Sequence, residues 1–258
     1  MTFVSLTTDY GTQDFYAAAL RVKLLERAPA VQVVDLTHRI QPFNIAQAAY
    51  QVESALNLFP AGSIHCVDVA SAVGDKSRFV LFKFRGQYVV GCDNGLPRII
   101  LEYGQPDVCV ALNVDGLVRH PSFAAIDIFP HVVAHIGSGK DPLLLGDDIP
   151  PMEATTLKPI VHNKMIRASV IHIDSYENVV LNIRKPEFEH TAQQRNFIIQ
   201  LRRGTDLHSI HTQYADVGEY EMTAFFNTTG YLEVAINRGN LAGINNINVG
   251  DTVQIDFV

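Results

Sequence analysis

Apolar runs that resemble β-strands alternate with amphipathic, helix-like patterns over residues 1–140. Such alternation is typical of an α/β domain with an open, mostly parallel sheet, in which polar loops gather at strand ends where ligands bind. The helical patterns lie at 14–28 and 44–59, and the strand-like runs lie at 3–9, 31–38, 62–70, 78–92 and 108–114.

The pattern changes beyond residue 150. Strand-like runs then follow one another with turns between them, at 165–174, 178–183, 197–203, 230–236 and 251–258. Because a proline-rich stretch from Pro150 to Pro159 separates the two patterns, we place a domain boundary there. The sequence therefore predicts an α/β N-terminal domain at 1–150 and a smaller all-β C-terminal domain at 160–258.

Composition and charge narrow the class of ligand. With 258 residues, of which 47% are hydrophobic, the chain is long enough to bury a substantial core. Its net charge of -7, with no segment that concentrates Lys and Arg, argues against nucleic acid and favours a small-molecule ligand. No apolar run approaches the roughly 20 residues of a membrane span, and the first residues lack a signal-peptide pattern, so we expect a soluble, cytoplasmic protein.

The cysteines and histidines do not suggest a metal site. The three cysteines have no C-x-x-C spacing, which argues against both a structural zinc site and a disulfide framework. His131 and His135 are four residues apart on a predicted helix, which is metal-ligand spacing. Because no acidic third ligand lies near them, a role in the core or on the helix surface is favoured over metal binding. We therefore expect no metal.

Acidic residues stand at the ends of several strand-like runs. Asp9 and Asp14 flank Gly11 between the first strand and the first helix, and Asp35 and Asp68 end later runs. A carboxylate at a strand end can accept hydrogen bonds from a vicinal diol such as a ribose, and one near a helix start favours an ammonium group. The alternative is structural, with Asp14 as a helix cap and Asp9 as a turn former.

Other loops allow a functional and a structural interpretation as well. Phe43 is either an aromatic wall for a ligand or a hydrophobic staple before a helix that Asn44 caps. Asn94 belongs to an Asp-Asn-Gly tripeptide, which is a turn former that can also line the cleft. In the second domain, Asn178 can pair with an adenine edge and Tyr176 can stack on its face, although turn chemistry explains both residues.

In their order and spacing these segments resemble one family, the S-adenosyl-L-methionine (SAM) hydroxide adenosyltransferases, relatives of the fluorinase and chlorinase enzymes. The resemblance runs along nearly the whole chain and includes LTTDYGTQDFY, PAVQVVDLTHRIQPFNIAQAA, FPAGSIHCVDV, VVGCDNGL, DIFPHVVAH, HIDSYENVVLNI, NTTGYLEVAINRGNLAG and GDTVQI. It implies an α/β N-terminal domain and a β-barrel-like C-terminal domain. It also implies a homotrimer that binds SAM between the N-terminal domain of one subunit and the C-terminal domain of the next.

The reaction that the resemblance implies is attack of water or hydroxide on C5′ of the ribose of SAM. The products are adenosine and methionine, and SAM is the substrate, with neither metal nor cofactor required. Because the sulfonium is already a good leaving group, the protein mainly has to place the nucleophile in line, exclude bulk water and help to remove a proton.

The resemblance also assigns binding residues. Asp9 matches the carboxylate that binds the ribose diol, Asp14 matches a contact of the methionine portion, and Phe43 matches the aromatic wall. The second domain supplies the adenine contacts Tyr176 and Asn178 and, near the rest of the pocket, Tyr214, Thr228 and Arg238.

The chain departs from the family at the residues that handle the attacking water. The family pattern V-D-P-G-V-G-x-x-R supplies an Asp and an Arg, and a later F-H-G-R-D-I-F supplies a His. Here Asp68 is retained, but two extra residues in the following loop put Ser77 in the place of the Arg and Arg78 one position later. Ala124 replaces the His. The catalytic candidates are Asp68 and Arg78, and we expect Arg78 either to turn toward Asp68 or to project into solvent.

These departures leave three functions open. The first is hydrolysis of SAM, slowed or altered by the divergent water-handling group. The second is a binding protein or sensor for SAM or adenosine that has no turnover. The third is an enzyme that acts on another adenosyl or nucleoside substrate.

Overall fold

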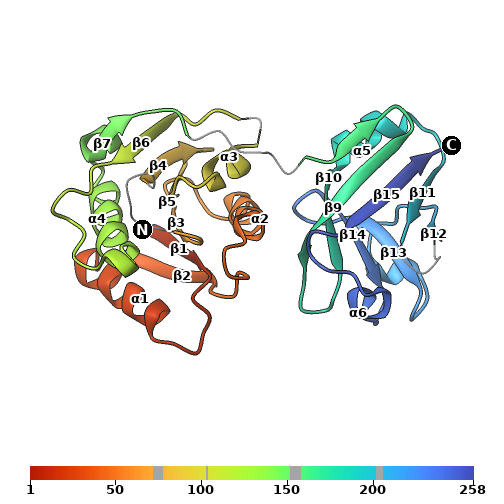
Figure 1. Cartoon of the computed structure of the whole chain (residues 1–258), viewed down its shortest axis with the longest axis horizontal. Coiled ribbons are helices and arrows are strands. Elements are labelled where there is room, and N and C mark those ends of the chain that lie inside the picture. The colour runs from red at the N-terminus through yellow and green to blue at the C-terminus, as the bar shows by residue number, and fades with distance from the viewer. Residues whose placement is uncertain (72–77, 103, 152–157, 202–205) are drawn as a thin grey trace. The chain divides into compact units, whose positions relative to one another are not determined.

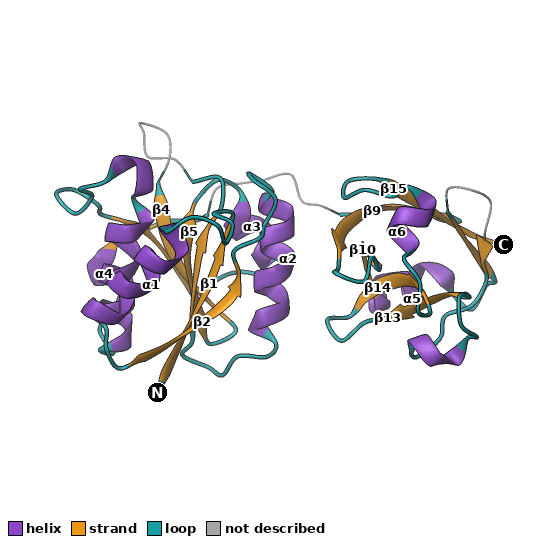
Figure 2. Ribbon diagram, turned by 90° about the horizontal axis from the view of Figure 1, so that it is seen from below, coloured by secondary structure: helices purple, strands orange, loops and turns teal. Residues whose placement is uncertain are grey.

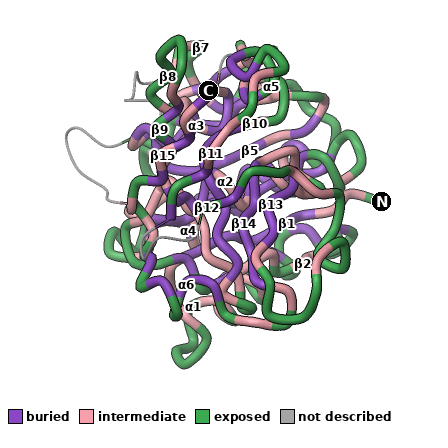
Figure 3. The backbone as a smooth tube through the Cα atoms, turned by 90° about the vertical axis from the view of Figure 1, so that its right-hand side faces the viewer, coloured by how far each residue is buried: buried purple, intermediate pink, exposed green. Residues whose placement is uncertain are grey.

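The computed structural model describes residues 1–71, 78–102, 104–151, 158–201 and 206–258. The chain forms two compact units, Met1–Thr156 and Leu157–Val258, each with its own buried core (Figure 1). The central strands are largely buried and the loops are exposed (Figure 3). Within the described ranges, no helix has both the length and the apolar character needed to cross a membrane.

The first unit is a sheet covered by helices on both faces (Figure 2). Helices α1 (Tyr16–Arg27) and α4 (Ala125–Gly137) pack on one face, and α2 (Ile45–Leu56) and α3 (Leu96–Leu101) pack on the other. In the spatial order β2-β1-β3-β5-β4-β6-β7, the strands are β2 (Val31–Thr37), β1 (Thr2–Thr8), β3 (Ile64–Asp68), β5 (Gln87–Cys92), β4 (Phe79–Phe84), β6 (Val108–Leu112) and β7 (Gly146–Asp148).

Helix α2 forms where its sequence signals predict it. Asn44 is the N-cap, and its side-chain oxygen accepts a hydrogen bond from the backbone N–H of Gln47 at 3.0 Å. Ala48, Val52 and Leu56, each four residues apart, are buried against the sheet. The predicted capping role of Asn44 is therefore confirmed.

The sheet of the first unit is mixed, which corrects the expectation of a mostly parallel sheet. Strands β2, β1, β3 and β5 pair in parallel, whereas β4, β6 and β7 pair with antiparallel neighbours. The turn between β4 and β5 consists of Arg85 and Gly86, whose φ angles are 51° and 74°. Two positive φ values are the geometry of a tight hairpin turn, and so short a turn joins only antiparallel strands. The run at 78–92 is thus a hairpin.

The second unit is β-rich, with a sheet that nearly closes into a barrel (Figure 2). In the spatial order β12-β11-β15-β9-β10-β14-β13, with β8 paired to β9, β13 at one end lies close to β12 at the other. The strands are β8 (Ile160–His162), β9 (Met165–Ile173), β10 (Val179–Arg184), β11 (Phe197–Gln200), β12 (Asp206–Leu207), β13 (Met222–Phe226), β14 (Tyr231–Ile236) and β15 (Thr252–Phe257).

Two short helices also belong to this unit, so the expectation of an all-β domain was too narrow. They are α5 (Lys185–Ala192) and α6 (Leu241–Asn245). Helices of this length show too few turns for a helical repeat to stand out from the surrounding strands.

Candidate active site

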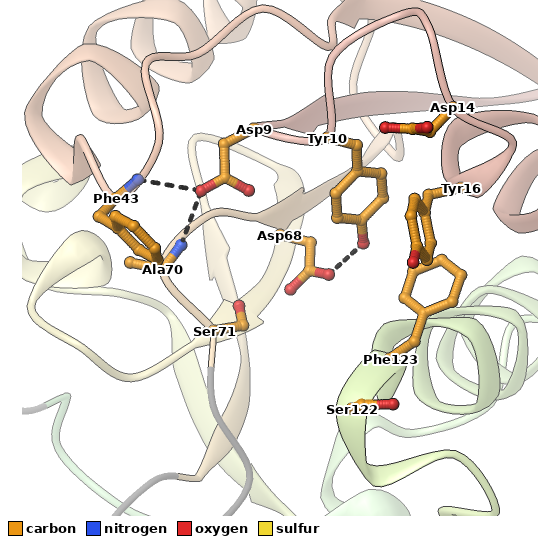
Figure 4. Close-up of a pocket in the computed structure, with 10 residues that line it drawn as sticks. All are labelled: Asp9, Tyr10, Asp14, Tyr16, Phe43, Asp68, Ala70, Ser71, Ser122 and Phe123. Carbon is orange, nitrogen blue, oxygen red and sulfur yellow. Dashed lines mark hydrogen bonds between the residues drawn. The ribbon is translucent and has the colours of Figure 1, made fainter.

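Parallel pairing of β1 with β3 brings two acidic segments together. Thr8 at the end of β1 lies opposite Asp68 at the end of β3. Asp9 and Tyr10 follow Thr8 directly, so they lie beside Asp68 at the carboxyl edge of the sheet (Figure 4). Ligands of open α/β sheets bind at this edge.

A pocket of about 330 Å³ lies at this edge. This volume is at the lower end of the range for small-molecule sites. Four of the predicted residues line the pocket, namely Asp9, Asp14, Phe43 and Asp68 (Figure 4). The rest of the described lining is Tyr10, Tyr16, Ala70, Ser71, Ser122 and Phe123.

Asp9 ties two loops to the pocket. Its Oδ2 accepts hydrogen bonds from the backbone N–H of Phe43 at 3.0 Å and of Ala70 at 3.4 Å. Phe43 lines the pocket and is 77% exposed. Its backbone has a φ of 67°. Such exposure is unlike a hydrophobic staple, which packs against the helix that it precedes.

Asp14 does not cap the first helix. Helix α1 begins at Tyr16, and its N-cap is Phe15, which makes no side-chain capping bond. The structural alternative for Asp14 is therefore wrong. Its side chain is exposed and lines the pocket instead.

Asp68 and Tyr10 form a hydrogen-bonded pair. Asp68 is 6% exposed, and its Oδ2 accepts a hydrogen bond from the Tyr10 hydroxyl. Burial raises the pKa of the Asp68 carboxyl; the nearby hydroxyls of Ser71 and Tyr10 lower it, and the Asp9 carboxylate raises it. Burial, followed by the charge of Asp68, raises the pKa of Tyr10, so the phenol remains a donor.

Tyr10 is a site residue that the sequence analysis missed. The available signal was its place directly after Asp9 at a strand end. Its hydrogen-bond partner lies 58 positions away along the chain, and only the pairing of β1 with β3 brings the two together.

Three aromatic rings form one wall of the pocket. The ring centroids of Tyr16 and Phe123 lie 5.3 Å apart, and that of Tyr10 lies 5.4 Å from Phe123 and 6.1 Å from Tyr16. The described lining also contains three carboxylates and no Lys or Arg side chain. Such a pocket suits a ligand that has an apolar body and a positive charge.

Arg78 lies with Asp93 and not with Asp68. Its Nε and Nη2 donate to Asp93 Oδ2 at 2.8 Å and 2.7 Å, and the Asp93 side chain is fully buried. A buried carboxylate requires a charged or hydrogen-bonded partner, which Arg78 provides. Arg78 therefore does not turn toward Asp68; it stands directly before β4 with its side chain 42% exposed, close to the solvent alternative, but its guanidinium is bound to Asp93. Ser77, the other candidate for the arginine position, lies outside the described residues.

Asn94 and Asp35 lie outside the pocket lining. The Asn94 amide donates to the backbone oxygens of Val69 at 3.0 Å and Ala70 at 3.2 Å, so it holds the loop that follows Asp68. Asp35 lies within β2 and pairs with Arg21 at 2.6 Å.

The second unit holds a separate polar cluster. The buried Asn178 donates through Nδ2 to Asp174 Oδ2 at 3.0 Å and to the Tyr214 hydroxyl at 3.3 Å. Tyr214 in turn donates to Glu233 Oε1 at 2.6 Å. Tyr176 belongs to the same turn and is 77% exposed. Asn178 and Tyr214 are thus in direct contact, and Tyr176 presents its ring to the surface.

The other two candidates of this unit differ in their surroundings. Thr228 is exposed and directly follows Asn227, whose amide donates to Glu233 Oε2 at 3.1 Å. Arg238 is exposed and pairs with Glu219. Thr228 therefore lies next to the polar cluster, whereas Arg238 has a partner outside it.

The two histidines of α4 have hydrogen-bond partners within the protein. His131 contacts Arg27 at 3.1 Å, and His135 contacts the backbone oxygen of Asp141 at 2.8 Å. Across the described ranges, no group of three or more His, Cys, Asp or Glu side chains is arranged to hold a metal ion. All three cysteines are buried free thiols.

Comparisons with known proteins find similarity to one family along nearly the whole chain. Residues 4–146 match the sequence family described as SAM hydroxide adenosyltransferase N-terminal domain, and residues 168–254 match the corresponding C-terminal domain. A protein of Thermus thermophilus named (R)-S-adenosyl-L-methionine hydrolase is 29% identical over 248 residues, which cover 92% of each chain. A fluorinase of Nocardia brasiliensis is 23% identical over 98% of this chain and 96% of its own.

The fold also has a counterpart among solved structures. The crystal structure of an uncharacterized conserved protein from Thermotoga maritima matches with a TM-score of 0.87 over 99% of this chain and 100% of its own. Because the two sequences are 24% identical, this match concerns the fold alone.

Proposed function

Because the chain belongs to the SAM hydroxide adenosyltransferase family, we propose that it hydrolyses SAM to adenosine and L-methionine. The observation that carries the proposal is the pocket in which Asp9, Asp14 and Asp68 face an aromatic wall. SAM combines a ribose diol, an ammonium group and a sulfonium, and carboxylates and aromatic faces suit all three groups.

In this reaction the residues of the pocket mainly have to position SAM and the attacking water. Asp9 presents to the ribose hydroxyls the oxygen that the loop amides do not hold, Asp14 pairs with the ammonium group, and Phe43 covers the ligand. As the water oxygen bonds to C5′, the C5′–S bond breaks and its electron pair remains on sulfur, which leaves the neutral thioether of methionine. Asp68 accepts the proton that the water loses.

The polar cluster of the second unit is the proposed contact for adenine. Because Asp174 and the Tyr214 hydroxyl hold Nδ2 of Asn178, its amide oxygen is the atom left for the edge of the base, and the exposed Tyr176 ring stacks on the face of the base. Tyr214, Thr228 and Arg238 complete this end of the site as the family resemblance implies. The homotrimer, in which a neighbouring subunit supplies this end, stays a prediction, as does the location in the cytoplasm.

Incubation of the purified chain with SAM tests the proposal. Chromatography is expected to show adenosine and methionine appearing in equal amounts. In the Asp68→Asn variant the rate is expected to fall about 10²- to 10⁴-fold, the usual contribution of general acid-base assistance, while adenosine still binds. If the wild-type chain formed neither product, the proposal would be overturned.

A second function, a sensor of SAM or adenosine, is favoured by the substitutions in the water-handling group. Ala124 stands where the family resemblance expects a histidine, and Arg78 is held by Asp93. Tight binding of SAM without product in the same incubation would establish this function instead.

A further inference from the structure

A second, smaller cavity adjoins the pocket. It measures about 30 Å³, which is enough room for a water molecule. Asp68, Ser71, Ser122 and Phe123 line both spaces, so the small cavity opens beside the place where the ligand is proposed to bind. The rest of its lining is Phe79, Pro121, Ala124 and Ala125.

Two buried polar atoms have no hydrogen-bond partner in the described part of the chain and belong to residues that line this cavity. They are Oδ1 of Asp68 and Oγ of Ser71, which make no hydrogen bond of normal geometry with each other although the Ser71 hydroxyl is close enough to lower the pKa of the carboxyl. Buried polar atoms in proteins are nearly always bonded, either to protein or to ordered water, because an unmade bond is costly. A carboxylate oxygen accepts hydrogen bonds and a hydroxyl both donates and accepts, so the two atoms together suit a water molecule.

Tyr10 determines which oxygen of Asp68 is available to a further hydrogen-bond partner. Its hydroxyl donates to Oδ2, and in Figure 4 Ser71 lies on the side of the other oxygen. The carboxylate is thereby held in an orientation that leaves Oδ1 for a second partner.

The small side chain of Ala124 provides room for this partner. Ala124 is 5% exposed and forms part of the cavity wall, at the position where the family resemblance expects a histidine. An imidazole at the same position would extend several atoms further from the backbone than the methyl group. Space that a ring would fill is thus open to solvent-sized molecules.

We propose that Asp68 Oδ1 and Ser71 Oγ bind the attacking water in the cavity beside Ala124, and that Tyr10 positions Asp68 by holding its other oxygen. The inference rests on the proposed hydrolysis of SAM and assigns its water-handling group. The bound water loses one proton to Asp68 Oδ1 as its oxygen bonds to C5′, and the electron pair of the C5′–S bond leaves with sulfur. Asp68 then releases the proton to solvent, and Tyr10 stays protonated throughout.

The groups around the Asp68 carboxyl predict how the reaction rate depends on pH. Asp9 and Tyr10 face it from the loop after β1, and Cys66 from within β3, while the segment 121–125 carries no ionisable side chain. The Tyr10 hydroxyl lowers the pKa of Asp68. Removing that hydroxyl therefore raises this pKa, and the acid limb of the kcat/KM profile is expected to move to higher pH.

Two single variants test the assignment on SAM turnover. Tyr10→Phe is expected to lower kcat about 10- to 100-fold, the effect of one hydrogen bond to a charged group. Ser71→Ala is expected to lower it about 2- to 10-fold, the effect of one neutral hydrogen bond. In both variants KM and the melting temperature are expected to stay near the wild-type values. The matched control is Tyr88→Phe, which removes a hydroxyl from β5 outside the pocket lining and is expected to leave kcat unchanged.

A double-mutant cycle separates positioning from mere packing. If Tyr10 acts through Asp68, then Tyr10→Phe introduced into the Asp68→Asn chain is expected to lower kcat no further. Full additivity of the two losses, or a Tyr10→Phe profile whose acid limb does not move, would overturn the role of Tyr10.

Failure of the inference is distinguishable from failure of the proposed function. A wild-type chain that hydrolyses SAM, together with fully active Tyr10→Phe and Ser71→Ala variants, would overturn only the inference. A wild-type chain without turnover would overturn both.

Discussion

At the scale of single residues, Asp9 has two tasks that different atoms carry out. Oδ2 accepts from the backbone N–H groups of Phe43 and Ala70, whereas Oδ1 is the oxygen that these loop amides leave to the pocket that Asp9 lines. A substitution at this position is therefore expected to affect both the shape of the pocket and the proposed contact to the ribose, and an informative variant has to separate the two effects.

Asp9→Asn is such a variant, because its amide oxygen can still accept from the loop amides while its NH₂ group replaces the acceptor that faces the ligand. We expect adenosine affinity to fall about 10- to 100-fold, the equivalent of about 1.5–3 kcal/mol for hydrogen bonds to a charged group, with little change in melting temperature. Asp9→Ala is expected to lower both quantities. Titration calorimetry and thermal unfolding measure them, and unchanged adenosine affinity in both variants would contradict the assignment of the ribose contact.

At the scale of elements, a buried chain of polar groups connects three strands and a helix of the first unit. Ser5 on β1 contacts His65 Nδ1 on β3 at 2.7 Å, and His65 Nε2 contacts Gln87 Oε1 on β5 at 2.8 Å. Gln87 in turn donates to the backbone oxygen of Leu56 at the end of α2 at 2.7 Å. These hydrogen-bonded side chains lie within the parallel part of the sheet, and the pocket lies at the edge of that part.

The buried imidazole predicts a loss of stability in acid. Burial lowers the pKa of His65 below its ordinary value of 6.5, and the hydrogen bond that its Nε2 donates to Gln87 Oε1 only partly opposes this. Below pH 6.5 the unfolded chain therefore binds more protons than the folded one. The contribution of the neutral His65 imidazole to the free energy of unfolding is fully present above this pH. It is lost as the pH decreases toward the pKa that His65 has in the folded chain. Burial also lowers the pKa of His131 and His172, which add to the same trend.

Thermal unfolding between pH 7.5 and pH 5.5 measures this trend. The His65→Gln variant is expected to lose about 1–3 kcal/mol at pH 7.5, because the buried hydrogen bonds are disturbed, but to show a shallower decrease in acid than wild type. His162→Gln, which changes an exposed histidine of β8, is the control. A pH dependence in His65→Gln as steep as that of wild type would show that His65 does not titrate on unfolding.

At the scale of the whole molecule, charge favours a cationic ligand. The chain carries a net charge of -7, and the described lining of the pocket contains three of its carboxylates and no basic side chain. Like charges at short range in a partly buried site repel by several kcal/mol, and salt weakens the interaction. The pocket is therefore expected to bind an uncharged nucleoside better than a phosphorylated one.

A comparison of adenosine with adenosine 5′-monophosphate tests this charge selection. The monophosphate is expected to bind at least about 10-fold more weakly at low ionic strength, and the difference is expected to narrow in 1 M salt, where the screening length is about 3 Å. Calorimetry at both ionic strengths measures the effect. Equal or tighter binding of the monophosphate would mean that a basic group beyond the described lining faces the ligand.

The sequence by itself determined the family and the order of structural classes along the chain. Alternating strands and helices followed by a β-rich part, and the Asn44 cap of α2, are all present in the structure. The family descriptions match 4–146 and 168–254, as the resemblance indicated. These features follow from neighbours along the chain, since hydrophobic periodicity, caps and motif spacing are local properties that a sequence displays directly.

Only the tertiary structure decided how the site is assembled. The pairing of β1 with β3 placed Tyr10 on Asp68, and the β4–β5 hairpin turned an expected parallel arrangement into a mixed sheet. Arg78 pairs with Asp93, 15 positions further on, and the two oxygens of Asp68 differ because Tyr10 occupies one of them. Such contacts join residues that are distant in sequence, and their partners depend on strand register and burial, which no local pattern specifies.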